Sequence, residues 1–126
     1  MAKKVKKSEE ARSTGSGPSK REYVEEFPMT RIRASVLNPR KSFPGEYIEE
    51  LAASIAAEGL LQPIAVRVVE PDGDGRDCEI ILGECRWRAC GRNGDAFIRE
   101  TVYEGVSDEL ALLMALVENL QRLQMN

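Results

Sequence analysis

The sequence predicts an α+β domain in which a small mixed sheet is packed against helices, and three observations lead to this prediction. Short β-branched runs alternate with helical periodicity in the order strand, helix, strand, strand, helix, strand, helix. A chain of 126 residues is within the size range of a single hydrophobic core. An apolar content of 42%, without a run of roughly 18 apolar residues, indicates a globular protein and excludes a membrane-spanning helix.

The first 22 residues are predicted to be a disordered basic tail, and residues 23–126 to be the domain. Residues 1–20 carry six Lys or Arg and two Glu, together with the stretch STGSGPS, so they offer few apolar groups to offset the entropy of ordering. The tail lacks the apolar segment of a secretory signal, which predicts a cytoplasmic protein. The remaining residues carry twelve Lys or Arg against nineteen Asp or Glu, and this acidic balance disfavours wrapping of nucleic acid by the domain itself.

Cysteine and histidine usage limits the chemistry. Three cysteines form an odd set, which argues against a disulfide framework. Because the chain has no histidine, the common Cys/His zinc patterns cannot be assembled, and any metal is expected to be bound by oxygen ligands.

In the first half, the segment FPMTRIRAS, residues 27–35, predicts a short strand, and the prolines, glycine and asparagine of residues 37–45 predict a loop. Ile48, Leu51 and Ile55 then recur at helical spacing, which predicts a helix that begins at residue 46 and ends at Gly59 as its C-cap.

In the second half, residues 63–82 predict two strands joined by the turn sequence DGDG, and Gly83 ends the second strand. A helix is predicted from Glu84 to Arg92, a strand over residues 96–104, and a last helix over residues 107–124 with Ser107 as N-cap. The last helix carries one apolar stripe, which is expected either to pack back on the sheet or to be covered by a missing C-terminal region or a partner: Leu110, Leu113, Met114, Val117 and Leu120.

The strand-to-helix turn at Gly83 is a candidate anion site. The first N–H groups of a helix have no intrahelical partners, and glycine lets a ligand approach the backbone. Arg86 adds a bidentate donor suited to phosphate, whereas Arg88 points away from it on a regular helix, so both reach one ligand only if it is extended, as a triphosphate is. The alternative is a solvated helix face on which Glu84 pairs with Arg88. Trp87 is predicted to belong to the core.

Four segments carry a family resemblance: NPRKSF (38–43), GLLQPIAVR (59–67), GECRWRA (83–89) and ALVENLQR (115–122). In this order they resemble the boxes of the N-terminal domain of ParB chromosome and plasmid partition proteins. The resemblance implies the ParB/sulfiredoxin fold, a CTP site with Mg²⁺, slow CTP hydrolysis, and a homodimeric clamp that closes on DNA at the nucleoid or a plasmid. It also implies that specific DNA contacts belong to domains beyond this chain. The basic tail is similar in composition to family peptides that stimulate a ParA-type ATPase.

The resemblance also implies roles for individual residues. Gln62 and Arg67 would lie near the cytosine, and Glu118 would bind Mg²⁺, although from spacing alone Glu118 could instead pair with Arg122 on a solvated face. The implied nucleotide-binding set is Gln62, Arg67, Gly83, Glu84, Arg86, Arg88 and Asn119.

Cys85 departs from the family pattern, because the partition family has an arginine at this position. The loss of one charge-assisted hydrogen bond corresponds to about 1.5 to 3 kcal/mol, or roughly 10- to 150-fold in affinity. Sulfiredoxins share the fold and carry their cysteine here, but their neighbouring histidine and glycine are replaced by Arg86 and Glu84. Two alternative functions therefore stay open: an interaction module that needs no nucleotide, and a sulfiredoxin-like ATP-dependent thiol enzyme that uses Cys85.

Overall fold

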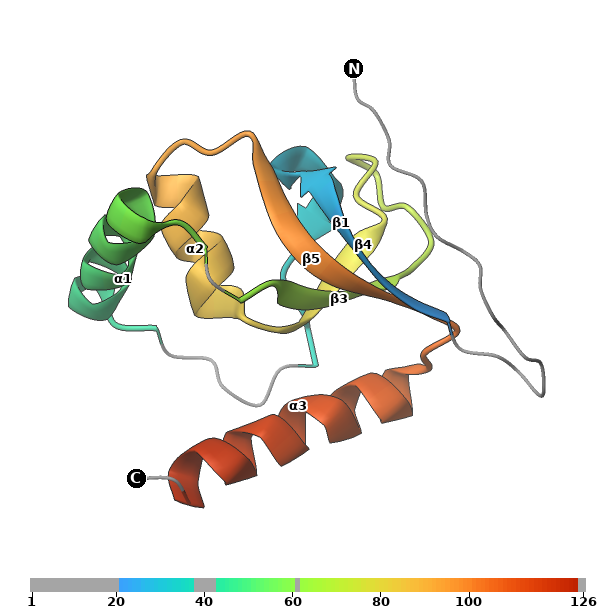
Figure 1. Ribbon diagram of the computed structural model, residues 1–126. Coiled ribbons are helices and arrows are strands. Elements are labelled where there is room, and N and C mark those ends of the chain that lie inside the picture. Colours follow the sequence, from blue (N-terminus) through green and yellow to red (C-terminus); the bar gives the residue numbers. More distant parts are fainter. Residues whose placement is uncertain (1–20, 38–42, 61, 125–126) are drawn as a thin grey trace.

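The computed structural model describes residues 21–37, 43–60 and 62–124, and it has the predicted α+β fold with a mixed sheet (Figure 1). The helices are α1 (Gly45–Glu58), α2 (Glu84–Arg92), α3 (Asp108–Gln124) and the short 3-10 helix η1 (Met29–Arg31). The strands are β1 (Arg21–Pro28), β2 (Ile32–Arg33), β3 (Ile64–Val68), β4 (Cys78–Leu82) and β5 (Phe97–Glu104).

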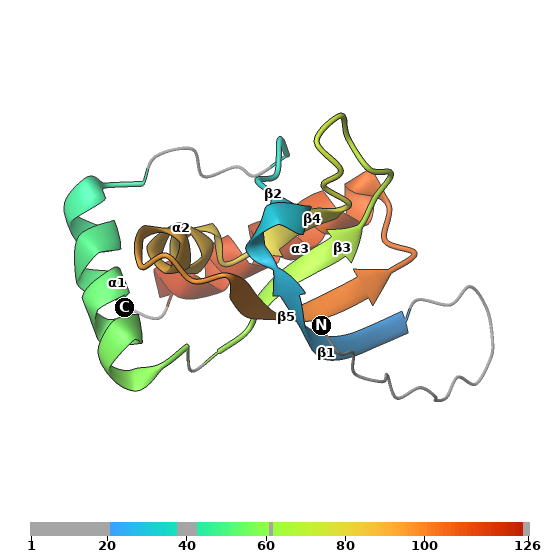
Figure 2. The same cartoon turned by 90° about the horizontal axis from the view of Figure 1, so that it is seen from above.

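The sheet is strongly curled. Its strand order is β1-β5-β3-β4-β2, so β1 and β2 form opposite edges. Only the three residues of η1 separate these two strands along the chain, and three residues span at most about 10 Å. The two edges must therefore approach each other, and Figure 2 shows β1 and β2 joined in this way. The β3–β4 and β1–β5 pairs are antiparallel, whereas β3–β5 and β2–β4 are parallel.

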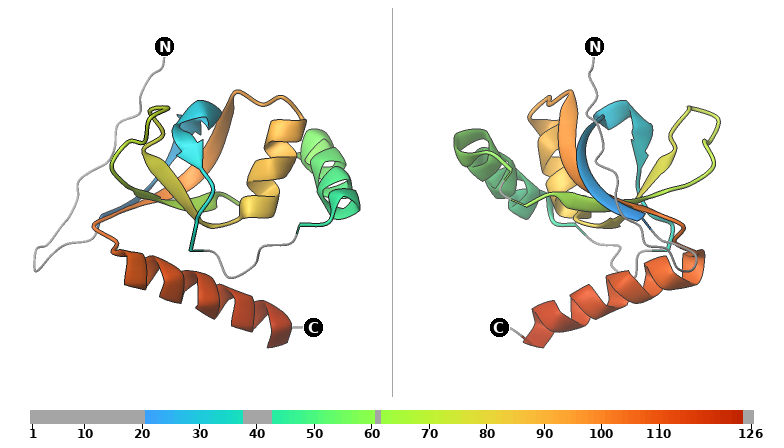
Figure 3. Two further views of the ribbon diagram at one scale, coloured as in Figure 1. Left: turned by 180° about the vertical axis from the view of Figure 1, so that it is seen from behind. Right: turned by 45° about the vertical axis from the view of Figure 1, so that its right-hand side comes forward.

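The main core fills the inside of the curl. Side chains of all five strands meet there, and α2 adds Trp87 and Cys90, which confirms that Trp87 packs with the core. A second, smaller cluster lies on the outer face of the sheet, where Ala65 and Ile81 pack against Ala111 of α3. A third joins α1 to α2 through Ile48, Ala52 and Ala89. α3 thus forms a layer of its own on the outer face (Figure 3).

The prediction of a single first strand over residues 27–35 is wrong. The segment is divided between the two edges of the sheet: Phe27 and Pro28 end β1, which pairs with β5, and Ile32 and Arg33 form β2, which pairs with β4. The 3-10 turn between them redirects the chain, and the Met29 N–H donates to the Ala96 carbonyl at 2.9 Å. β1 also begins at Arg21, within the predicted tail, and the first 20 residues lie outside the described residues.

The predicted apolar stripe of α3 is only partly buried. Leu110 and Met114 pack on the outer face of the sheet, but the residues buried most deeply are Ala111 and Ala115, because small side chains let the helix approach the sheet closely. A coherent row of larger apolar side chains remains exposed: Leu113, Leu116, Val117, Leu120 and Leu123. We call this row the α3 stripe. Within the described residues, no helix combines the length and the apolar character that crossing a membrane requires.

Candidate functional site

The turn between β4 and α2 depends on glycine. Gly83 has φ +95° and is the N-cap of α2. A Cβ atom at this position would lie 2.9 Å from Cγ2 of Ile64, so both the backbone conformation and the space exclude a larger residue. Because the chain turns directly from the strand into the helix, the first N–H groups of α2 are left without intrahelical partners beside an open cleft.

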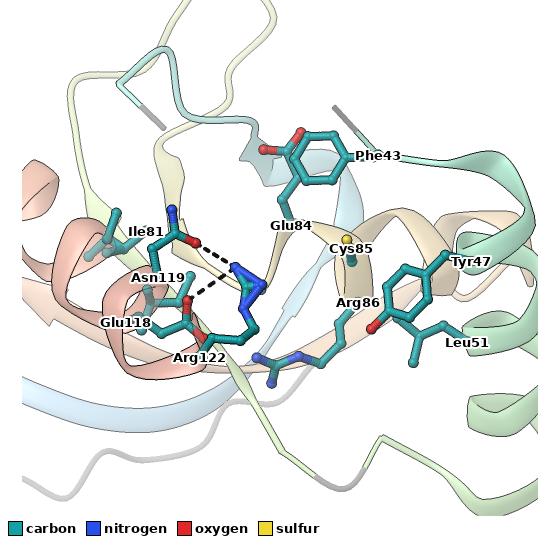
Figure 4. A pocket seen from close by; sticks show the side chains of 13 residues that line it. Phe43, Tyr47, Leu51, Ile81, Glu84, Cys85, Arg86, Glu118, Asn119 and Arg122 are labelled. Atoms are coloured by element: carbon teal, nitrogen blue, oxygen red, sulfur yellow. Dashed lines mark hydrogen bonds and ion pairs between the residues drawn. The ribbon is translucent and has the colours of Figure 1, made fainter. Parts of the chain in front are cut away.

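A cleft of about 190 Å³ lies at this turn (Figure 4). Its walls come from three directions: the start of α1, the β4–α2 turn, and the second half of α3. The lining residues are Phe43, Tyr47, Leu51, Ile81, Leu82, Gly83, Glu84, Cys85, Arg86, Ala115, Glu118, Asn119 and Arg122. Five of the eight predicted site residues therefore meet in one place, although they are up to 36 positions apart in the sequence: Gly83, Glu84, Arg86, Glu118 and Asn119.

Arg86 projects from the first turn of α2 towards the segment that leads into β3. Its Nη1 donates to the carbonyl oxygens of Gln62, at 3.2 Å, and Pro63, at 3.1 Å. Gln62 itself is exposed and reaches the site through this backbone contact, while its neighbour Leu61 lies outside the described residues. Arg86 thus connects the α2 turn to the segment for which the family resemblance implies a position near the base.

Glu84 and Arg88 form the i,i+4 pair that the sequence offers as an alternative reading. Arg88 Nε and Nη2 donate to Glu84 Oε2 at 3.1 and 2.8 Å. The Arg88 guanidinium also lies over the Phe43 ring, 4.8 Å from its centroid. Unlike a solvated pair, this one has a buried carboxylate, since Glu84 is 6% exposed. Arg88 is turned towards its neighbours and does not line the cleft.

The α3 wall contributes Glu118, Asn119 and Arg122. Arg122 Nη2 donates to Asn119 Oδ1 and lies 3.9 Å from Glu118 Oε1, a distance at which an exposed ion pair contributes little. Figure 4 shows the Arg122 side chain between these α3 residues and Arg86. The cleft therefore holds two guanidinium groups beside the N-terminus of α2, an arrangement that favours an anion.

Arg67 lies elsewhere, buried on the outer face of the sheet. Its guanidinium donates to Glu79 Oε1 at 3.1 and 2.7 Å and to the Val106 carbonyl at 3.1 Å, and it pairs with Asp108 at 2.8 Å. Burial lowers the pKa of Arg67, but the hydrogen bonds with Glu79 and Asp108 outweigh burial, and the pKa is raised overall. These contacts engage the guanidinium fully with protein groups.

Sequence reasoning did not select several lining residues. From the sequence, Arg122 is expected only as a partner of Glu118, yet its position four residues later on the same helix places both on one face, where both line the cleft. Tyr47 and Leu51, also four residues apart on α1, form the apolar wall opposite α3. The sequence gives no signal that this face of α1 borders the cleft, because that depends on how α1 packs against α2.

Comparison with known proteins identifies the family. The sequence model of the ParB N-terminal domain matches residues 13–120. The chain belongs to this family.

A probable chromosome-partitioning protein ParB of Pseudomonas putida is 44% identical over 103 residues, which cover 82% of this chain and 34% of the relative. The chromosome-partitioning protein Spo0J of Thermus thermophilus is 43% identical over 109 residues, covering 86% and 36%. A nucleoid occlusion protein of a Geobacillus species is 41% identical over 102 residues, covering 81% and 34%. The chain spans about a third of the length of the curated relatives it matches.

Solved structures agree with this ParB membership. A C-terminally truncated ParB of Caulobacter crescentus in complex with CTP-gamma-S superposes with a TM-score of 0.69 at 35% identity, covering 78% of this chain and 53% of that chain. A sulfiredoxin of Arabidopsis thaliana superposes with a TM-score of 0.54 at 30% identity, covering 66% and 86%. The expectation of a ParB/sulfiredoxin-like fold is therefore confirmed.

Proposed function

We propose that this ParB N-terminal domain binds CTP with Mg²⁺ in the cleft beside Gly83 and uses the nucleotide as a switch for self-association. The observation that carries the proposal is the meeting of the α2 N-terminus and Arg86 with Glu118, Asn119 and Arg122 from α3. A related ParB of known structure holds a CTP analogue, and this supports the choice of nucleotide.

The cleft suits the phosphate end of a nucleotide. Sites for whole drug-sized ligands are usually roughly 300 to 1,000 Å³, and this cleft is about 190 Å³. We therefore assign it to the triphosphate and place the base outside it, towards Gln62, whose carbonyl Arg86 contacts at 3.2 Å. The N-terminus of α2 and the guanidinium groups of Arg86 and Arg122 would bind phosphate oxygens.

Glu118 fits the role of a Mg²⁺ ligand. Mg²⁺ is usually held by one or two carboxylates together with phosphate oxygens and water. The described part of the chain has no group of three or more His, Cys, Asp or Glu that could hold a metal ion by themselves. Glu118 would therefore bind the metal in company with the nucleotide, and the ion would supply charge neutralisation between the phosphates.

Self-association would use the α3 stripe. These leucine and valine side chains are 44 to 77% exposed and lie on the helix that also carries Glu118 and Asn119. A nucleotide that fixes α3 against the α2 turn would thus fix the orientation of the apolar surface. We propose that site-specific DNA binding belongs to the remaining length of the ParB protein, since the body of this chain is acidic. Stimulation of a ParA-type ATPase by the basic tail stays a prediction, because the tail lies outside the described residues.

Calorimetric titration of CTP, ATP and GTP in the presence of Mg²⁺ tests the nucleotide site. CTP is expected to bind most tightly, and Arg86→Ala and Arg122→Ala should each weaken binding about 10- to 150-fold. Arg92→Ala is the matched control, because Arg92 is on the same helix but pairs with Glu49 outside the cleft. Equal binding of all three nucleotides, or equal affinities for the control and the cleft variants, would refute the proposal.

A second candidate function is an interaction module that works without nucleotide, and the exposed α3 stripe favours it independently of the cleft. Sedimentation velocity separates the two. The switch predicts that CTP and Mg²⁺ increase dimerisation, and that Leu120→Asp abolishes this increase. Dimerisation of equal strength with and without CTP, still sensitive to Leu120→Asp, would support the interaction module instead.

A further inference from the structure

The buried ion cluster around Arg67 holds the beginning of α3. Arg67 donates to the carbonyl of Val106, the second residue before the helix, and to the carboxylate of Asp108, its first residue. On its other side it donates twice to Glu79 of β4, which is 2% exposed and also accepts a hydrogen bond from Arg33 at 3.3 Å. One guanidinium therefore connects two strands of the sheet to the first turn of α3.

The packing of α3 against the sheet is confined to one narrow face of the helix. Its buried residues are Ala111 and Ala115, whereas the side chains of the α3 stripe are exposed. Leu110 and Met114 flank these alanines on the sheet, but this apolar contact covers only the first half of a helix 17 residues long. The Arg67 contacts, by contrast, are directional. Those with Glu79 and with the Val106 carbonyl are buried, whereas Asp108 is bound at the surface, where its side chain is 75% exposed.

The distance from the anchor to the cleft amplifies any change in that angle. Ten residues separate Asp108 from Glu118, which is about 15 Å along a helix. A tilt of about 10° at the anchor would displace Glu118 by roughly 2.6 Å over that length. Metal ligands tolerate deviations of only about 0.2 Å, so the α3 wall of the cleft needs a fixed first turn.

We infer that Arg67 is a positioning residue for the nucleotide site: by holding Val106 and Asp108 against Glu79, it sets the angle of α3 and so brings Glu118 and Asn119 to the α2 turn. The inference assigns Arg67 a role through α3 in place of contact with a base. The expected effect of Arg67 on nucleotide binding rests on the proposed function, whereas its role in setting the angle of α3 does not.

Residual dipolar couplings of backbone amides test the structural part, because they report the orientation of α3 relative to the sheet. Arg67→Met keeps the length of the side chain and removes its donors. If loss of the partner of Glu79 prevents folding, the double variant Arg67→Met/Glu79→Met removes both charges. Arg76→Met is the control, since Arg76 pairs with Asp72 in the β3–β4 connection and does not touch α3.

In the Arg67 variant, or in the double variant, the couplings of α3 should no longer fit the wild-type orientation, while those of the sheet still fit. CTP affinity should fall at least about tenfold, and Arg67→Lys, which can reach one partner at a time, should restore part of it. Unchanged α3 couplings in these variants would overturn the inference. This holds even if CTP affinity falls, because a fall in affinity without a change in the orientation of α3 would indicate that Arg67 contacts the nucleotide directly. If the wild type binds no nucleotide, the proposed function fails and the couplings alone decide the role of Arg67.

Discussion

Glu100 is a buried acid whose ionisation should control the pH dependence of stability. It lies in the middle of β5, is 0% exposed, and both its carboxylate oxygens lack a hydrogen-bond partner among the described residues. Its cross-strand neighbour is Glu25 of β1, a second carboxylate on the same face of the sheet. Burial raises the pKa of Glu100 to about 8; the Arg31 guanidinium opposes this rise, and the negative charges of Glu25 and Asp77 add to it.

The magnitude follows from the difference between the folded and unfolded protein. The pKa of an exposed glutamate is 4.5, and one pKa unit corresponds to about 1.4 kcal/mol, so a pKa of about 8 corresponds to roughly 5 kcal/mol. The pKa of Glu100 is higher in the folded than in the unfolded state, so the contribution of protonated Glu100 to the free energy of unfolding is complete below pH 4.5. This contribution is lost progressively between pH 4.5 and 8, and no more of it is lost above pH 8. This loss is comparable with the whole stability of a marginal domain.

Urea unfolding between pH 4.5 and 8.5 measures the effect, with Glu100→Leu as the test variant and Glu100→Gln as a non-ionising polar variant. The free energy of unfolding of the wild type, relative to Glu100→Leu, should fall by up to about 5 kcal/mol across this range, and Glu100→Leu should be the more stable protein at pH 8. Glu26→Gln, on the exposed side of β1, controls for the loss of one negative charge. A difference between wild type and Glu100→Leu that is the same at every pH would refute the reasoning.

Two further predictions concern the cleft and its thiol. Gly83→Ala and Gly94→Ala both place a side chain at positive φ, but only the side chain at position 83 meets a neighbour within 3 Å. Thermal unfolding should therefore show a loss of stability of about 1 to 2 kcal/mol for Gly94→Ala and a clearly larger loss for Gly83→Ala. Equal losses would contradict the close packing of the turn. Cys78 and Cys90 are buried, and burial raises the pKa of the Cys90 thiol to about 11. A thiol reagent should therefore label Cys85 first in the native protein. CTP should slow this labelling. Equal labelling rates for all three cysteines would contradict the exposure of Cys85 in the cleft, and no effect of saturating CTP would contradict the proposed binding of the nucleotide there.

The parts of the fold that local sequence determines were predictable. The β3–β4 hairpin, the Gly83 turn and the helix that follows it each carry their own signals, which are β-branched runs, turn residues and a glycine at a strand end. β1 was missed because its sequence, REYVEEFP, is rich in glutamate and is stabilised by pairing with residues of β5 that lie 69 to 83 positions later. Such pairing is a property of the tertiary structure, and the alternation of Tyr23 and Phe27 towards the core becomes visible only once β5 is in place.

The same distinction between local sequence and tertiary structure applies to the candidate site. Residues within one box of sequence, such as Gly83 and Arg86, were predicted to lie together, and they do so in the cleft. Arg67 could not be placed from sequence, because alternation along β3 separates it from Ile64 and Val66 without indicating which face α3 would cover.

The two faces of the curled sheet have different roles, so the effects of variants on stability and on CTP affinity can be measured separately. The inner face holds the core and Glu100, so changes there should alter stability and its pH dependence while leaving α3 in place. The outer face holds Arg67 and Glu79, which connect the sheet to α3 and through it to one wall of the cleft. At pH 8, Glu100→Leu should therefore raise stability without changing CTP affinity, whereas the double variant Arg67→Met/Glu79→Met should lower CTP affinity even where stability is kept. Parallel measurement of unfolding and CTP binding on these two variants would show whether the faces act independently; a loss of CTP affinity in Glu100→Leu would show that they do not.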